Sequence, residues 1–120
     1  MKMSVQNKAL QEKIYKAYDG RCAYCGRRIE YEDMQVDHLI PQRNGGTDSF
    51  DNLMPSCRLC NHYKRAHSLT TFRKMIEEIP DKLQDRYIYK VGLAYGNVRE
   101  FRKEIVFYFE KCRLPGGGME

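Results

Sequence analysis

The sequence lacks any long apolar run. Its longest uninterrupted apolar stretch is Ile105–Phe109, whereas a membrane-spanning helix needs roughly 20 such residues. The first ten residues mix charged and polar side chains with the apolar ones and contain no apolar core of a secretory signal. With 4 Pro and 9 Gly among 120 residues, the composition also excludes collagen-like and low-complexity chains. We therefore expect a globular, cytoplasmic protein without a membrane span, folded as a single domain over residues 1–120.

Acidic residues are absent from residues 52–76, although this segment contains five basic ones. The net charge of +5 therefore arises here, because the remaining residues balance 16 Lys and Arg against 16 Asp and Glu. A local excess of positive charge suits an anionic partner such as nucleic acid, and it also suits a plain solvated surface. The basic residues of the segment are Arg58, Lys64, Arg65, Arg73 and Lys74.

The five cysteines do not fit a disulfide framework, because the expected compartment keeps thiols reduced and an odd count leaves one cysteine unpaired. Four of them form two Cys-x-x-Cys pairs, Cys22 with Cys25 and Cys57 with Cys60. Two such pairs in one small chain predict a closed, tetrahedral, structural Zn²⁺ site. The alternatives are buried packing cysteines or a redox pair, and a redox pair explains only half of the pattern. Cys112 stands alone in an apolar stretch and is predicted to be a core residue.

Apolar periodicity and turn residues predict an α+β fold. We expect helices over 4–18, from 57 onward and over 68–79, with Pro80 closing or restarting the last, and a weaker helix over 81–95. Short strands are predicted over 34–40 and 52–54 around a Gly-rich loop. Residues 105–109 fit either a strand or one face of a helix, and their β-branched and aromatic side chains favour the strand.

Asp37 and His38 place a hard oxygen donor next to a side chain that titrates near neutral pH. Asn52 follows within the same insert between the two cysteine pairs, and Asn61 comes directly after the second pair. A divalent ion held by carboxylate and amide oxygens, beside an imidazole that can take a proton from water, is what phosphodiester hydrolysis requires. The insert therefore predicts metal-dependent nuclease chemistry.

These motifs resemble the HNH endonuclease family. The resemblance covers residues 22–64 and is carried by CAYC at 22–25, VDHLIP at 36–41, GG at 45–46, DNL at 51–53 and CRLCN at 57–61 with Lys64. It implies a zinc-clipped ββα-metal module, treble-clef-like, in which His38 is the general base and Asp37 a metal ligand. Asn52 would brace the loop and steer the base. Asn61 would be the second metal ligand, as in the H-N-N variant found in the HNH domain of RNA-guided CRISPR effectors.

His62 directly follows Asn61 and is an alternative metal ligand if the helix is rotated by one position. Oxygen donors from Asp37 and Asn61 would favour Mg²⁺ or Mn²⁺ over Zn²⁺. Lys64 lies three residues after Asn61 and should share its helix face, where it can meet a phosphate. Arg43, Arg58 and Arg65 are the further candidates for contacts with the nucleic acid.

One geometric difficulty accompanies this interpretation. Asp37 and His38 are adjacent, and neighbours on a regular strand point to opposite faces. Because both must serve one site, the strand must bend or end there.

We expect a helix over 1–20, the zinc-clipped core over 21–66, a helical and partly β extension over 67–114 and a tail over 115–120. The predicted function is DNA hydrolysis by a one-metal mechanism, with RNA as substrate left open. Two alternatives remain, namely a non-catalytic zinc-containing nucleic-acid-binding module and an interaction or inhibitor module with a vestigial site. Oligomeric state does not follow from the sequence.

Overall fold

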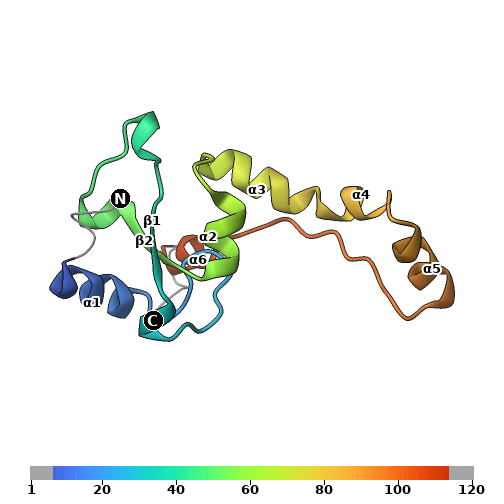
Figure 1. Ribbon diagram of the computed structural model, residues 1–120, viewed down its shortest axis with the longest axis horizontal. Helices are drawn as coiled ribbons and strands as arrows, with labels where there is room; N and C mark the ends of the chain where they lie inside the picture. The colour runs from blue at the N-terminus through green and yellow to red at the C-terminus, as the bar shows by residue number, and fades with distance from the viewer. Residues whose placement is uncertain (1–6, 114–120) are drawn as a thin grey trace. The chain divides into compact units, whose positions relative to one another are not determined.

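The computed structural model describes residues 7–113, and these divide into two compact units. Unit 1 contains the described residues up to Leu69 together with those from Val106 onward, and unit 2 is Thr70–Ile105. Figure 1 labels the elements of both. The predicted helix start at residue 4 and the predicted tail lie outside the described residues.

Helix α1, Lys8–Ala17, begins where the side chain of Asn7 accepts a hydrogen bond from the backbone N–H of Leu10 at 3.1 Å. It ends before Asp19 and Gly20, which both adopt positive φ. The helix buries Ile14 against Leu53 of strand β2, with Leu10, Val36 and other partly buried side chains around them. This is the predicted amphipathic helix, and it covers the hairpin of unit 1.

The two strands form an antiparallel hairpin, β1 over Gln35–His38 and β2 over Leu53–Ser56. His38 pairs with Leu53 and Gln35 with Ser56, so Asp37 stands opposite Met54. All four residues of β2 are buried. The hairpin therefore places Asp37 and His38 at the end of a strand whose partner is fixed in the core. Between the strands lie two short 3₁₀ turns, η3 (Gln42–Asn44) and η4 (Phe50–Asn52), after a first such turn, η2, at Tyr31–Asp33.

Helix α2, Arg58–Lys64, follows β2 directly. Its first turn is capped by sulfur, because Cys57 Sγ accepts the backbone N–H of Cys60 at 3.4 Å. The predicted helix after the second cysteine pair is thus confirmed.

In unit 2 the chain forms three helices. Helix α3, Leu69–Glu77, begins at the boundary between the units and is followed by α4, Ile79–Leu83, and α5, Tyr87–Tyr95. Pro80 lies in the first turn of α4, so it restarts a helix. The single helix predicted over 81–95 is wrong, since α4 ends at Leu83 and Arg86 is extended before α5. The returning segment is held by polar contacts, as Ile105 donates to Glu77 and accepts from Arg73.

The strand predicted over residues 105–109 is also wrong. Helix α6, Tyr108–Cys112, occupies this region, and the residues before it form no strand. Glu110 accepts the backbone N–H of Phe107 at 2.8 Å, which starts the helix there. The N–H groups of Tyr108 and Phe109 donate to the carbonyls of Tyr24 and Ala23 at 3.0 and 2.8 Å. Among the described residues, the sheet contains only β1 and β2, and the rings of Phe107 and Phe109 pack on Tyr24, which lies between the first two cysteines.

Within the described part of the chain, no helix has the length and apolarity that crossing a membrane requires.

Candidate functional site: a cysteine cluster and an Asp-His pocket

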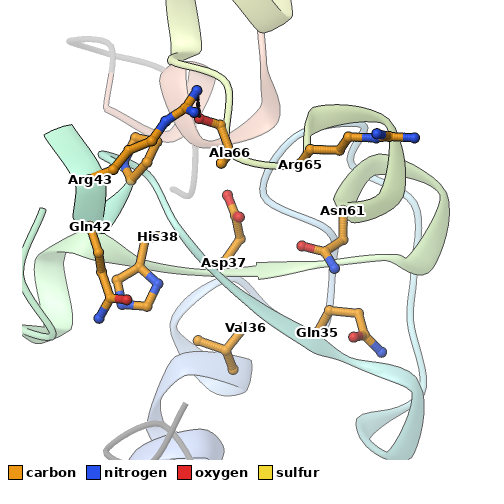
Figure 2. A pocket seen from close by; sticks show the side chains of 10 residues that line it. Gln35, Val36, Asp37, His38, Gln42, Arg43, Asn61, Arg65 and Ala66 are labelled. Atoms are coloured by element: carbon orange, nitrogen blue, oxygen red, sulfur yellow. Dashed lines mark hydrogen bonds between the residues drawn. The ribbon is translucent and has the colours of Figure 1, made fainter. Parts of the chain in front are cut away.

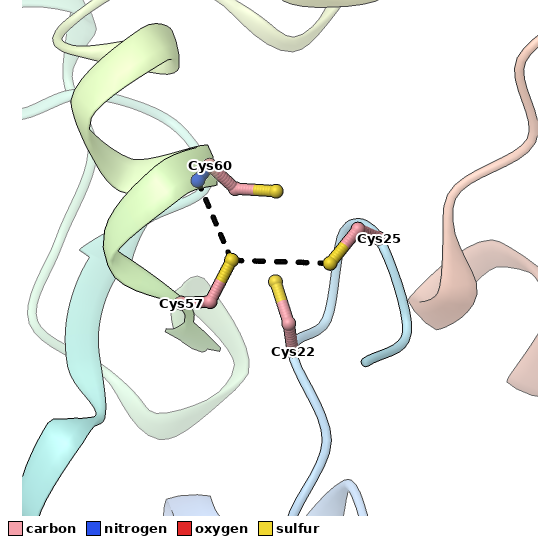
Figure 3. Close-up of side chains that lie close together, drawn as sticks. All are labelled: Cys22, Cys25, Cys57 and Cys60. Atoms are coloured by element: carbon pink, nitrogen blue, oxygen red, sulfur yellow. Dashed lines mark hydrogen bonds between the residues drawn. The ribbon is translucent and has the colours of Figure 1, made fainter. Parts of the chain in front are cut away.

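The four predicted zinc-binding cysteines come together in one cluster. Their Sγ atoms lie within 4.8 Å of one another, and all but Cys25 are buried. Figure 3 shows Cys57 and Cys60 at the start of α2 facing Cys22 and Cys25 on the first turn. The Sγ atoms of Cys25 and Cys57 are 3.8 Å apart. A tetrahedral ion with Zn–S bonds of about 2.3 Å places its sulfurs about 3.8 Å apart, so the cluster fits a structural Zn²⁺ ion.

The electrostatics of the cluster favour a cation as well. A hydrogen bond with Cys60 lowers the pKa of Cys22 to about 5, while the same bond raises the pKa of Cys60. Burial raises the pKa of Cys25. Arg27 donates to Cys57 Sγ at 3.5 Å from the edge of the cluster. Four thiolates this close together repel one another, and a bound metal ion relieves that repulsion.

The predicted catalytic residues line a second site, a pocket between β1, the loop after it and the end of α2. Asp37, His38 and Asn61 all line this pocket, together with Arg43 and Arg65. Figure 2 shows the carboxylate of Asp37 directed toward Ala66 and the imidazole of His38 beside Gln42. Strand β1 ends at His38, and the N–H of Leu39 donates to the carbonyl of Asn52 at 2.9 Å, so the hairpin bonding extends one residue further. Asp37 and His38 are both residues of the strand, and both line the pocket.

Asp37 is 8% exposed and receives two strong hydrogen bonds on one oxygen. The hydroxyl of Tyr24 donates to Asp37 Oδ2 at 2.6 Å, and Lys64 Nζ lies 3.0 Å from the same atom. Among the described residues, none donates a hydrogen bond to Oδ1. The carboxylate is thus held from one side, and Oδ1 is the oxygen left for another ligand.

Lys64 does not lie where the sequence predicts. Its side chain has no exposed surface, and its ammonium bonds Asp37 and donates to the carbonyl of His38 at 3.2 Å. On the helix face that it shares with Asn61, the Lys64 ammonium is buried. A buried ammonium needs a counter-charge, and the Asp37 carboxylate supplies it. In this arrangement Lys64 supports the pocket from behind and does not reach a phosphate.

His38 is held by an acid that the sequence analysis did not identify. Its Nε2 lies 2.7 Å from Oδ1 of Asp48, an exposed residue of the loop. An ionised carboxylate can only accept, so Nε2 carries the proton and Nδ1 is the basic nitrogen. No hydrogen bond from a described residue occupies Nδ1.

The side chain of Asn52 closes the loop between the strands. Its Oδ1 accepts the N–H of Ile40 at 2.9 Å, and its Nδ2 donates to the carbonyls of Ile40 and Thr47 at 3.2 and 2.8 Å. Gly46 lies against this bridge, since a Cβ there would stand 1.6 Å from the carbonyl oxygen of Ile40. Asn52 therefore joins both ends of the loop that follows His38, as a bracing residue would.

The remaining predicted residues divide into two groups. Asn61 is half-buried and lines the pocket, whereas His62 is exposed and does not line it. Arg43 donates to the carbonyl of Ala66 at 3.0 Å, and Figure 2 shows this bond across the pocket. Arg65 lines the pocket with a positive φ of 52°. Arg58 is exposed at the start of α2 and is not part of the pocket lining.

Two residues of the site were missed from the sequence. Tyr24 lies between the first two cysteines, and only its position in the turn hints at a role. Asp48 is one of several acids in a polar loop, and its tie to His38 depends on how that loop folds. A long-range pairing of this kind leaves no periodic signal in the sequence.

Comparisons with known proteins agree with the geometry of the site. A family model described as HNH endonuclease matches residues 22–67. The CRISPR-associated endonuclease Cas9 of Actinomyces naeslundii is 35% identical over 86 residues, which cover 69% of this chain and 7% of that protein. The CRISPR-associated endonuclease Cas9 of Corynebacterium diphtheriae is 22% identical over 126 residues, which cover 94% of this chain and 12% of that protein.

A solved structure also shares the fold. The crystal structure of the Type II-C Cas9 enzyme from Actinomyces naeslundii matches with a TM-score of 0.50 and 23% identity, over 59% of this chain and 8% of that one. The chain thus spans only about a tenth of the length of the curated relatives that it matches. The two cysteine pairs, the Asp-His pocket and these matches together identify residues 22–67 as a segment that matches the HNH endonuclease family.

Proposed function

We propose that the chain is a metal-dependent nuclease that hydrolyses DNA phosphodiester bonds by a one-metal mechanism with His38 as the general base. The observation that carries the proposal is the convergence of Asp37, His38 and Asn61 on one pocket that Arg43 and Arg65 also line. The relatives are named endonucleases, which supports the same reaction class. The four-cysteine cluster is proposed to hold a structural Zn²⁺ ion.

The role of His38 follows from its contact with Asp48. With Nε2–H bound to the carboxylate, Nδ1 is free to take a proton from an attacking water. The carboxylate also stabilises the imidazolium that forms when that proton arrives. Asn52 fixes the loop that contains Asp48, because it bonds to both Ile40 and Thr47. The imidazole is thus oriented before the substrate binds.

The donor set of the pocket fits a hard divalent cation. Asp37 Oδ1 and the amide oxygen of Asn61 are the donors we assign to it, since both side chains line the pocket. Oxygen ligands favour Mg²⁺ or Mn²⁺. When bound, such an ion supplies positive charge that stabilises the scissile phosphate and its leaving oxygen.

The two arginines of the pocket are proposed to bind the DNA backbone. Arg43 extends from the loop after β1, and Arg65 from the end of α2. A guanidinium group can donate two parallel hydrogen bonds to two oxygens of one phosphate. Such contacts would position the DNA backbone relative to His38. Arg58 lies outside the pocket and is proposed as a more distant contact.

The test is incubation of the purified protein with supercoiled plasmid in Mg²⁺, in Mn²⁺ and in EDTA, with a single-stranded RNA as a second substrate. One pocket of this kind predicts nicking of the plasmid to the open circle in either metal and no reaction in EDTA. The variant His38→Ala should abolish nicking while its melting temperature and its affinity for DNA stay unchanged. The variant Asp48→Asn should keep the fold and lower the rate about tenfold or more.

A His38→Ala protein that nicks at the wild-type rate would remove His38 from its assigned role. Zinc-loaded, folded wild-type protein that binds DNA with steep salt dependence and never nicks it would favour the non-catalytic binding module instead.

A further inference from the structure

Tyr24 links the two sites of the molecule. It lies between Cys22 and Cys25 and is 2% exposed. Its ring contacts Phe107 and Phe109 edge-on, with ring centroids 5.5 and 6.1 Å away. Its hydroxyl donates a hydrogen bond to Asp37 Oδ2 at 2.6 Å.

Lys64 reaches the same oxygen from the other cysteine pair. It lies on α2, four residues after Cys60, and therefore on the same helix face as that cysteine. The sulfur of Cys57 caps the first turn of this helix. Its Nζ lies 3.0 Å from Asp37 Oδ2 and 5.9 Å from the centre of the Tyr24 ring. The two donors of Asp37 thus come from the two segments that the cysteine cluster joins.

This arrangement determines which carboxylate oxygen remains available. Two donors occupy Oδ2, so the carboxylate cannot rotate without breaking a buried hydrogen bond and a buried ion pair. Oδ1 is then presented to the pocket in one orientation. Partners that orient a metal ligand in this way typically change metal affinity by about 10- to 100-fold when they are removed.

We propose that Tyr24 is a positioning residue for Asp37, and that through it the cysteine cluster sets the affinity of the pocket for its divalent ion. The inference rests on the proposed function in one respect, the assignment of Asp37 as a metal ligand. It adds that the structural zinc site and the catalytic site are coupled, because Tyr24 in the first cysteine turn fixes the orientation of the Asp37 carboxylate.

The first test is the affinity of the zinc-loaded protein for Mn²⁺, measured from the electron paramagnetic resonance signal of the free ion. The variant Tyr24→Phe removes only the hydroxyl and keeps the ring against Phe107 and Phe109. We expect its Mn²⁺ affinity to fall about tenfold, with the zinc content unchanged. In plasmid nicking, the Mn²⁺ concentration for half-maximal rate should rise by the same factor, and saturating Mn²⁺ should restore the rate.

Tyr15→Phe is the matched control. It also removes one tyrosine hydroxyl with a short hydrogen bond, in this case 2.7 Å to the carbonyl of Ile29, which is not part of the pocket. This variant should bind Mn²⁺ like the wild type. If Tyr24→Phe lowers stability, Tyr15→Phe shows how much stability is lost when a half-buried tyrosine hydroxyl outside the pocket is removed.

Asp37→Ala separates this inference from the proposed function. If it abolishes Mn²⁺ binding while Tyr24→Phe binds Mn²⁺ as tightly as the wild type, the metal site stands and the positioning role is overturned. If Asp37→Ala leaves Mn²⁺ binding unchanged, or the wild type binds none, the metal assignment fails and the inference fails with it. Loss of zinc from Tyr24→Phe at wild-type Mn²⁺ affinity would also overturn it.

Discussion

Arg65 holds a backbone conformation that its residue type does not favour. Its φ of 52° and ψ of −129° occur at the first turn after α2, which the N–H of His67 closes by donating to the carbonyl of Lys64 at 3.0 Å. A side chain in such a region costs roughly 1–3 kcal/mol, and glycine avoids this cost. The same residue lines the pocket beside Asn61. From this strain at a residue of the pocket we expect a binding role for the Arg65 side chain.

Arg65→Gly should therefore separate stability from binding. We expect the free energy of unfolding to rise by about 1 kcal/mol, because the strain is relieved and glycine gives back part of the gain through unfolded-chain entropy. DNA affinity should fall, and the slope of log affinity against log salt should decrease by about 1 in magnitude. Urea unfolding and a salt series of DNA-binding titrations measure the two effects.

Asp19 provides the control for this variant. It also has a positive φ, 59°, but does not line the pocket. Asp19→Gly should leave the slope of the salt series unchanged. A wild-type salt slope for Arg65→Gly would show that its side chain makes no phosphate contact.

At the scale of elements, the loop between β1 and β2 positions Asp48, which contacts the imidazole of His38, the proposed general base. Asn52 bonds to Ile40 and Thr47, while Gly46 donates its N–H to the carbonyl of Pro41 at 3.0 Å. The space beside Ile40 admits a glycine only, since any Cβ at residue 46 would overlap the Ile40 carbonyl. Asp48 follows two residues later and bonds His38. A displaced loop would thus misplace the carboxylate that orients the imidazole.

Gly46→Ala should disturb this element while the zinc site stays intact. We expect a loss of stability of about 1–3 kcal/mol from the overlap and a loss of nicking activity larger than this instability explains. Zinc content, measured by atomic absorption, should remain at the wild-type level. The matched control is Gly45→Asn, because Gly45 has φ of 93° with open space around it, and Asn tolerates positive φ better than most residues. If both variants nick alike, the Ile40 contact has no role in the site.

The elements of unit 1 were largely predictable from the sequence. Cysteine spacing, the β-rich stretch before Pro41 and the apolar stripe ending near Tyr18 are local signals, and the structure confirms the cluster, the hairpin and α1. The break between α4 and α5 near Arg86 and the helix α6 after Phe107 were not predictable from local signals. Residues 105–109 have strand-forming side chains, but whether they form a strand depends on a partner edge, which only the tertiary structure reveals.

The site shows the same division at the scale of side chains. Which residue types meet in the pocket followed from the motif, whereas the direction of each side chain did not. Lys64 shares a helix face with Asn61, yet burial of that face turns its ammonium to Asp37. Tyr24 and Asp48 act across distances in sequence that no local pattern encodes.

At the scale of the whole molecule, the matched family segment packs against residues that lie outside it. Residues 22–67 contain both cysteine pairs and the pocket, but the first cysteine turn is covered by residues from the far end of unit 1. Phe107 and Phe109 are 2% and 4% exposed, lie against Tyr24, and the second donates its N–H to Ala23. The buried surroundings of Tyr24 thus depend on a segment that follows unit 2 in the sequence.

A chain that ends at residue 105 should show this dependence. It retains all four cysteines of the cluster and every residue of the pocket, and loses Phe107, Phe109 and the two backbone hydrogen bonds to Tyr24 and Ala23. We expect weaker zinc binding and a melting temperature lower by about 10 °C or more, since removing one buried Phe alone costs about 3–5 kcal/mol. Titration with a chromogenic zinc chelator gives the affinity. A chain ending at residue 113 is the control, and equal zinc affinities for the two chains would contradict the dependence.

The packing of Phe107 and Phe109 on Tyr24 also orders events in time. A ribosome releases Cys22, Tyr24 and Asp37 early, while Phe107 and Phe109 are still to be made. Until they emerge, the first cysteine turn lacks its aromatic cover, and one of the two donors of the Asp37 carboxylate is less firmly held. The pocket proposed for this chain would thus bind its divalent ion more weakly on a nascent or prematurely terminated polypeptide, and would reach its full metal affinity only once translation has passed α6.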